Sequence, residues 1–144
     1  MRFSFGNVEL TSKVIDGKFP DYNRVIPTAH TKHLTIDRSL LLQTLQRAAI
    51  LSNERFRGVR LSLSPQTLKI ACTNNEQEEA DEELEVAYDG GAVDIGFNIN
   101  YLLDALATVG STEVTLSLQD SAASALFTMP GRTDFKYVVM PMRI

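Results

Sequence analysis

The sequence predicts an α+β fold in which one structural unit is used twice. Two stretches with helical periodicity, residues 38–52 and 100–109, are each preceded by one short alternating stretch and followed by three more. The resulting order is strand, helix and three strands, and then the same again. The two copies share this βαβββ order without evident residue identity. Such a duplication predicts a pseudo-twofold domain with both helices on one face of the sheets.

The two helices are predicted from apolar side chains that recur at helical spacing, about 100° per residue. Asp37 is a suitable N-cap for the first helix, and Asn100 is a suitable cap for the second. Gly110 follows the second helix at the position where glycine commonly ends one. The predicted apolar stripes are Leu41, Leu45 and Ala48 in the first helix and Leu102, Leu103 and Leu106 in the second.

Most of the remaining chain alternates between apolar and polar residues, as strands with one buried face do. Pro65-Gln66 is predicted to be the turn of a hairpin, and Asp89-Gly90-Gly91 a second turn. Cys72 falls in one alternating run, so we expect a small buried core residue rather than a nucleophile. Strands are predicted at residues 33–36, 60–64, 67–72, 84–88, 93–97, 113–118, 123–127 and 135–140.

The N-terminal residues do not belong to the repeated pattern. Residues 2–5 and 10–15 predict a hairpin around Gly6-Asn7, and a turn-rich linker comes next at residues 16–22. A lone hairpin is marginally stable in water. We therefore expect residues 1–27 to be the end of a preceding domain and residues 28–144 to form the domain itself.

Length and composition indicate one ordinary globular domain. The chain has 144 residues, of which 44% are hydrophobic and 22% charged, which excludes collagen-like, disordered and disulfide-framework classes. One cysteine cannot form an internal disulfide, which is typical of a reducing compartment. No apolar stretch reaches the roughly 20 residues of a membrane helix. The first residues also lack the apolar core of a signal peptide. We expect a cytoplasmic protein without membrane contact.

The chain carries a net charge of −4, which argues against strong independent DNA binding because that affinity comes mainly from cationic side chains. Residues 74–83 are rich in carboxylates. These carboxylates are bunched in sequence without a histidine nearby, which favours a solvated surface. A second interpretation is a face for a basic partner, which would gain association rate and specificity. A metal-dependent hydrolase built on Glu76–Glu83 would require a stoichiometric divalent ion and is the weakest of the three interpretations.

No motif for catalysis is found. His30 and His33 lie in a polar connector without a cysteine or carboxylate at ligand spacing, so we expect surface histidines rather than a metal site. The sequence contains no glycine-rich phosphate loop, no serine nucleophile elbow and no paired-cysteine motif. We expect a binding protein rather than an enzyme, with no cofactor.

Two apolar features are candidates for binding surfaces. Ile50 lies opposite the core stripe of the first helix, on the side of Gln43 and Arg47, and Leu51 also lies off that stripe. Apolar residues left on a polar face suggest a protein interface. The alternative is a frayed helix end whose side chains fold back onto their own domain. The C-terminus, residues 138–144, ends on apolar residues that include two methionines. Methionine is adaptable and is common in peptide grooves. The alternative is a tail packed into its own core.

Several segments, taken in order, resemble the bacterial sliding-clamp family, the beta subunit of DNA polymerase III. The resemblance runs through essentially the whole chain. The duplicated βαβββ unit agrees with the DNA-clamp fold, of which each clamp subunit has three copies. The segments that carry the resemblance are residues 16–22, 47–54, 56–60, 74–80, 95–98 and 137–143.

The resemblance implies a DNA-encircling ring of two subunits that holds polymerase on its template. Its partners, among them the polymerase III alpha subunit, the clamp-loader delta subunit and translesion polymerases, carry short peptides of the Gln-Leu-x-Leu-Phe kind. These peptides share one hydrophobic groove between the second and third domains. The matching positions in this chain are Pro20, Arg24, Val25, Asn98, Tyr101, Ala122, Ser124, Val138, Met140, Pro141, Met142 and Arg143, with Ala122 replacing a larger apolar residue often found there.

The resemblance also implies roles for other residues. Ile50 and Leu51 would lie at the ring-closing interface with the other subunit, where Glu76, Glu78 and Glu79 would face basic residues. Arg24 and Arg47 would face double-stranded DNA through non-specific phosphate contacts.

Relative to the family, the first domain and nearly all of the second are missing from this sequence. An alternative function is therefore a natural short clamp product that begins at Met1 and either assembles its own ring or sequesters clamp partners.

Overall fold

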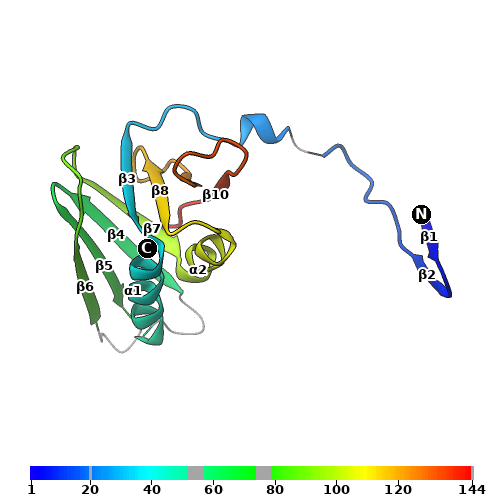
Figure 1. Cartoon of the computed structure of the whole chain (residues 1–144), viewed down its shortest axis with the longest axis horizontal. Coiled ribbons are helices and arrows are strands. Elements are labelled where there is room, and N and C mark those ends of the chain that lie inside the picture. The colour runs from blue at the N-terminus through cyan, green and yellow to red at the C-terminus, as the bar shows by residue number, and fades with distance from the viewer. Residues whose placement is uncertain (20, 52–56, 74–78, 144) are drawn as a thin grey trace.

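The computed structural model describes residues 1–19, 21–51, 57–73 and 79–143, with only the backbone of Leu51. Its elements have the predicted order of two βαβββ units behind an N-terminal hairpin (Figure 1). Within the described residues, no helix is long and apolar enough to cross a membrane. The elements are β1 (Arg2–Phe5), β2 (Val8–Thr11), the 3-10 helix η1 (Tyr22–Arg24), β3 (Lys32–Asp37), α1 (Arg38–Leu51), β4 (Gly58–Ser64), β5 (Thr67–Thr73), β6 (Glu79–Glu85), β7 (Val93–Asn98), α2 (Ile99–Thr108), β8 (Glu113–Leu118), β9 (Ala125–Thr128) and β10 (Tyr137–Val139).

The two units exchange their first strands. One antiparallel sheet has the order β10-β9-β8-β3, and the other has the order β6-β5-β4-β7. Strand β3 of the first unit therefore pairs with β8 of the second along its whole length, from Lys32 opposite Leu118 to Asp37 opposite Glu113. Strand β7 of the second unit pairs with β4 of the first, with Arg60 opposite Gly96. Because each sheet contains strands of both units, the two units form one domain.

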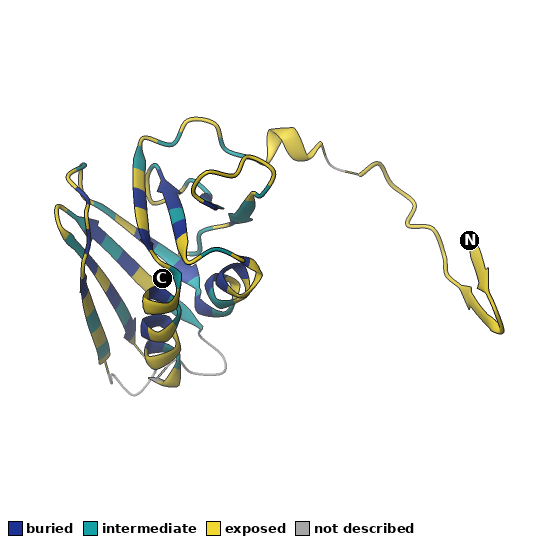
Figure 2. Cartoon of the chain, viewed as in Figure 1, coloured by how far each residue is buried: buried dark blue, intermediate teal, exposed yellow. Residues whose placement is uncertain are grey.

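The core lies between the sheets and the two helices. Helices α1 and α2 contact each other, and each contacts strands of both sheets. The strands present alternating buried and exposed residues, which appear as stripes in Figure 2. Phe97 on β7 and Phe127 on β9 are the largest fully buried side chains, and Leu41, Leu45 and Ala48 of α1 are buried as predicted. The expectation of a buried Cys72 is also confirmed.

The N-terminal hairpin stands apart from this core in Figure 1. Residues 1–19 are all exposed (Figure 2). Their apolar side chains have no interior of their own, because β1 and β2 form a sheet of only two strands.

The structure corrects several predicted boundaries. The cap of α2 is Asn98 rather than Asn100, since the Asn98 side chain accepts a hydrogen bond from the Asn100 amide and α2 begins at Ile99. The strand predicted at residues 84–88 is β6, Glu79–Glu85, so the second half of the acidic run is a strand. Strands β2, β9 and β10 are also displaced or shorter than predicted. Asp37 does cap α1, accepting from the Leu40 amide at 2.7 Å.

Candidate functional site

The C-terminal tail joins the two sheets. Strand β10 ends at Val139, shortly before Pro141, which has no backbone N–H to continue a ladder. The Met142 amide then donates to the Gly96 carbonyl on β7, with an N···O distance of 2.8 Å. Because β7 is the edge strand of the second sheet, this bond fixes the tail across the boundary between the sheets.

Met140 is held in place although it is exposed. Its side chain is 61% exposed, and the Ser124 hydroxyl donates to its sulfur at 3.1 Å. Ser124 is itself fixed, because its carbonyl accepts a hydrogen bond from His30 Nε2 at 2.7 Å. The preceding loop is shaped by Asp120, whose carboxylate accepts from the amide of Ala122. The adaptable thioether of Met140 is thus exposed while hydrogen bonds hold the residues beside it.

The start of α2 contributes two further predicted groove residues. The Asn98 side chain caps the helix, with Oδ1 3.0 Å from the Asn100 nitrogen. Tyr101 lies in the first turn, and 55% of it is exposed. The Arg57 guanidinium, just before β4, donates to Asn100 Oδ1 at 3.3 Å and ties that segment to this helix. Tyr101 therefore offers an aromatic ring and a hydroxyl to solvent, an arrangement that suits a binding surface.

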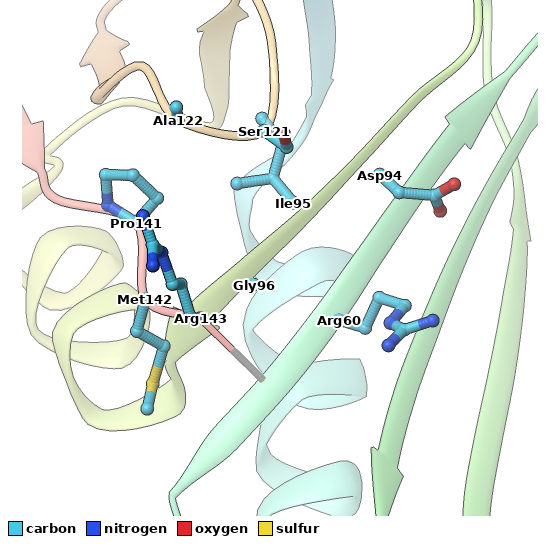
Figure 3. Close-up of a pocket in the computed structure, with 9 residues that line it drawn as sticks. All are labelled: Arg60, Asp94, Ile95, Gly96, Ser121, Ala122, Pro141, Met142 and Arg143. Atoms are coloured by element: carbon cyan, nitrogen blue, oxygen red, sulfur yellow. The ribbon is translucent and has the colours of Figure 1, made fainter.

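A cavity of about 760 Å³ opens beside the tail (Figure 3). It is lined by four of the predicted groove residues and by five residues not predicted to belong to a site. The alternation of β4 and β7 contains a signal for two of these, because it places Arg60 and Asp94 on the outward face. The predicted lining residues are Ala122, Pro141, Met142 and Arg143, and the others are Arg60, Asp94, Ile95, Gly96 and Ser121.

The structure does not bring every predicted groove residue into this cavity. Val138 is half-buried in β10, where it pairs with Leu126 of β9. Arg24 ends η1 with its side chain largely exposed and its Nε 3.8 Å from Asp21 Oδ2. Val25 comes next in the chain and is 48% exposed. Pro20 lies outside the described residues.

The predicted ring-interface residues are only partly visible. Ile50 is 81% exposed near the end of α1, which excludes the alternative that it folds back into the core. Glu79 is exposed at the start of β6. The side chain of Leu51 and residues Glu76 and Glu78 lie outside the described residues.

Arg47, predicted to face DNA, is paired with a carboxylate of its own domain. Its Nε lies 2.7 Å from Glu82 Oε1, and its Nη2 lies 3.0 Å from Oε2, a bidentate arrangement. The hydrogen bond from Arg47 lowers the pKa of Glu82, and the same bond raises the pKa of Arg47. Any phosphate that binds this guanidinium competes with Glu82.

No metal-binding arrangement is found in the described part of the chain, where no three His, Cys, Asp or Glu side chains are grouped to hold an ion. His33 Nδ1 is instead 2.9 Å from the Ser117 hydroxyl. Burial raises the pKa of the Cys72 thiol, which lowers the thiolate fraction at neutral pH.

Comparison with known proteins agrees with this architecture. The family model for the DNA polymerase III beta subunit, C-terminal domain, matches residues 23–143. Over all 144 residues the chain is 50% identical to the beta sliding clamp of Pseudomonas aeruginosa and 48% identical to that of Escherichia coli. In each case it covers 39% of the relative.

Solved structures show the same likeness in three dimensions. A crystal structure of the DNA polymerase III subunit beta from Pseudomonas aeruginosa matches with a TM-score of 0.90 at 50% identity, covering 99% of this chain and 39% of that one. The Caulobacter crescentus pol III beta structure matches with a TM-score of 0.90 at 43% identity, over 99% of this chain and 39% of that one. The chain thus spans about two fifths of the length of these relatives, and it belongs to the family of the DNA polymerase III beta subunit, C-terminal domain.

Proposed function

We propose that this chain serves as the C-terminal domain of a sliding clamp, a non-catalytic processivity factor of a replicative DNA polymerase. The observation that carries the proposal is the supported apolar surface at the tail, where Met140 is exposed yet hydrogen-bonded to Ser124. The relatives at 48–50% identity are named beta sliding clamp. Those names favour this function over a short product that assembles by itself or sequesters clamp partners.

The proposed ligand is a short peptide of the Gln-Leu-x-Leu-Phe kind. Its leucine and phenylalanine would pack against Met140, Pro141 and Met142, because an apolar cleft with few polar groups suits such anchors. The Tyr101 hydroxyl would orient its polar atoms. The proposed partners are the polymerase III alpha subunit, the clamp-loader delta subunit and translesion polymerases, in the bacterial cytoplasm.

Residues 1–27 are proposed to be the end of the preceding clamp domain. The hairpin exposes four apolar side chains in eight residues, Phe3, Phe5, Val8 and Leu10, at 48–63%. An apolar surface of this kind is typical of a segment whose packing partner lies elsewhere. The same preceding domain would supply the second wall of the groove, next to Arg24 and Val25.

A second set of residues is proposed to serve ring closure and DNA binding. Ile50 would pack against the other clamp subunit, beside the acidic strand β6, whose charges would face basic residues. Arg24 and Arg47 would face the phosphates of double-stranded DNA. The pairing of Arg47 with Glu82 supports weak, salt-sensitive contacts, since the guanidinium is shared.

Fluorescence anisotropy of a labelled Gln-Leu-Ser-Leu-Phe peptide, titrated with this chain, tests the proposal. We expect saturable binding that weakens by about tenfold or more in Met140→Asp, because a carboxylate placed among apolar contacts loses its hydration.

Ile50→Asp is the matched control, since it also places a carboxylate at an exposed apolar position. It should bind the peptide as the unchanged chain does. The absence of saturable binding by a chain shown to be folded by circular dichroism would contradict peptide binding by this domain.

A further inference from the structure

The tail separates two cavities that share three residues. The cavity of about 760 Å³ beside Ala122 and Pro141 lies on one side. A second cavity, of about 810 Å³, extends over β4, β5 and β6 on the other. Arg60, Met142 and Arg143 line both. The outward face of the sheet β6-β5-β4-β7 is therefore continuous with the end of the candidate groove.

Arg60 occupies an open position on this face. Its strand neighbours Val59 and Leu61 are buried on the other side of the sheet, so Arg60 points outward. The residues directly opposite it are Gly96 on β7 and Ala71 on β5. Both neighbours have little or no side chain, and Arg60 is exposed (Figure 3).

Of the cationic side chains around the tail, one forms an ion pair and two do not form one among the described residues. Lys69, in the second cavity, forms an ion pair with Asp81 at 2.7 Å. Arg60 and Arg143 form no ion pair with any residue that the structure describes. Asp94 is exposed and lines the first cavity, two residue pairs along the β4–β7 ladder from Arg60. Among the described residues, two guanidinium groups at the tail are thus without an ion pair, in a chain whose net charge is −4.

We propose that Arg60, with Arg143, binds an acidic side chain in the segment that flanks a partner's groove-bound motif. This inference rests on the proposed peptide-binding function and extends it beyond the five-residue motif. Arg60 lines the same cavity as Pro141 and Met142, so a segment that continues beyond a motif bound against these two residues would pass beside its guanidinium. Guanidinium groups bind carboxylates through charge-assisted, often bidentate hydrogen bonds.

The surrounding charges favour a peptide over nucleic acid. Asp94 lines the first cavity and Glu79 the second, and both would repel the regularly spaced phosphates of a duplex. A single carboxylate needs only one position beside Arg60 and Arg143, which line the first cavity together. The site therefore selects isolated negative charges in an extended segment.

The test compares the core peptide Gln-Leu-Ser-Leu-Phe with versions extended by Gly-Gly-Glu-Glu at the C-terminal end or Glu-Glu-Gly-Gly at the N-terminal end. Glutamine replaces glutamate in the matched neutral extensions. We expect one glutamate-extended peptide to bind this chain about three- to tenfold tighter than its neutral match, an effect that weakens with salt.

Substitutions test whether the tighter binding of the acidic peptide depends on residues of the cavity. Arg60→Gln should reduce the ratio between acidic and neutral peptides to below about twofold, and Asp94→Asn should increase that ratio because it removes a repelling charge. Lys136→Gln, an equal loss of charge at a residue that lines neither cavity, should leave the ratio unchanged.

The outcomes separate the two proposals. If the core peptide fails to bind, both the proposed function and this inference are overturned. If the core peptide binds but neither acidic extension gains affinity, only the inference fails. A loss of affinity for a labelled DNA duplex in Arg60→Gln, with an unchanged peptide ratio, would assign Arg60 to phosphate contacts and overturn the inference.

Discussion

Strands β6 and β10 hold equivalent places in the two units, and their surfaces are opposite. Each is the last strand of its unit and the edge of its sheet. Strand β6 has seven residues, of which five are acidic, whereas β10 has the three residues Tyr137–Val139 and no charge. The acidic edge discourages pairing with another chain. The short apolar edge leads directly to Met140 and the tail.

A duplicated unit can therefore keep one kind of core while its edge strands diverge. The buried residues that define the two sheets are alike in kind, mostly leucine, isoleucine, valine and phenylalanine. The candidate functional surfaces lie at the two edge strands, in the tail after β10 and in the carboxylates along β6. Three experiments examine this division between a shared core and divergent edges.

The largest effect is expected in the core. Phe97→Ala and Phe127→Ala each remove a phenylalanine that is at most 1% exposed, one from each sheet. Each should lower the free energy of unfolding by about 3–5 kcal/mol, through lost burial and the cavity left behind. Urea denaturation monitored by circular dichroism measures both. A much smaller cost for one of the two would show that the sheets do not share the core equally.

A smaller, pH-dependent effect is expected at the acidic edge. The bond from Arg47 lowers the pKa of Glu82 in the folded state, so the pair stabilises the fold above the ordinary carboxyl range and this contribution is lost as pH falls through the lowered pKa. Glu82→Gln should therefore lower Tm modestly at pH 7, with the difference shrinking below about pH 4.

Glu85→Gln on the same strand is the control, because Glu85 forms no ion pair among the described residues. It should leave Tm nearly unchanged. An equal Tm for Glu82→Gln and the unchanged chain at pH 7 would show that the Arg47 pair contributes nothing to stability.

The smallest effect is expected at Ile50. Since its side chain is 81% exposed, Ile50→Ala should change the free energy of unfolding by less than about 0.5 kcal/mol. Thermal denaturation measures this directly. A large drop in Tm would indicate that Ile50 supports the core and is not reserved for a partner.

The sequence is sufficient to predict the repeated order of elements because apolar periodicity directly reflects local burial. It cannot predict the strand exchange, since the pattern of β3 is the same whether that strand pairs with β4 or with β8. The predicted cap of α2 is wrong because Asn98 and Asn100 are chemically equal candidates. Only the extended backbone of Asn98, with φ −75° and ψ 121°, distinguishes them.

The acidic strand and the cavity are harder to predict, for physical reasons. Glutamate and aspartate are depleted in strands, so the sequence places β6 too far along the chain, at residues 84–88. The methionines of the tail are enough to indicate a candidate groove. Arg60 and Asp94 escape prediction because the cavity they line exists only where the tail crosses β7, a contact between residues distant in sequence.

The exchange of β3 and β7 means that a single repeat cannot complete a sheet without another copy. One unit by itself would supply three paired strands and one strand that projects away from them. Two such units on separate polypeptides would complete both sheets by trading that strand, as a swapped homodimer does. The domain thus has the architecture of a homodimer whose two halves are joined in one polypeptide, through the connection between β6 and β7 at residues 86–92.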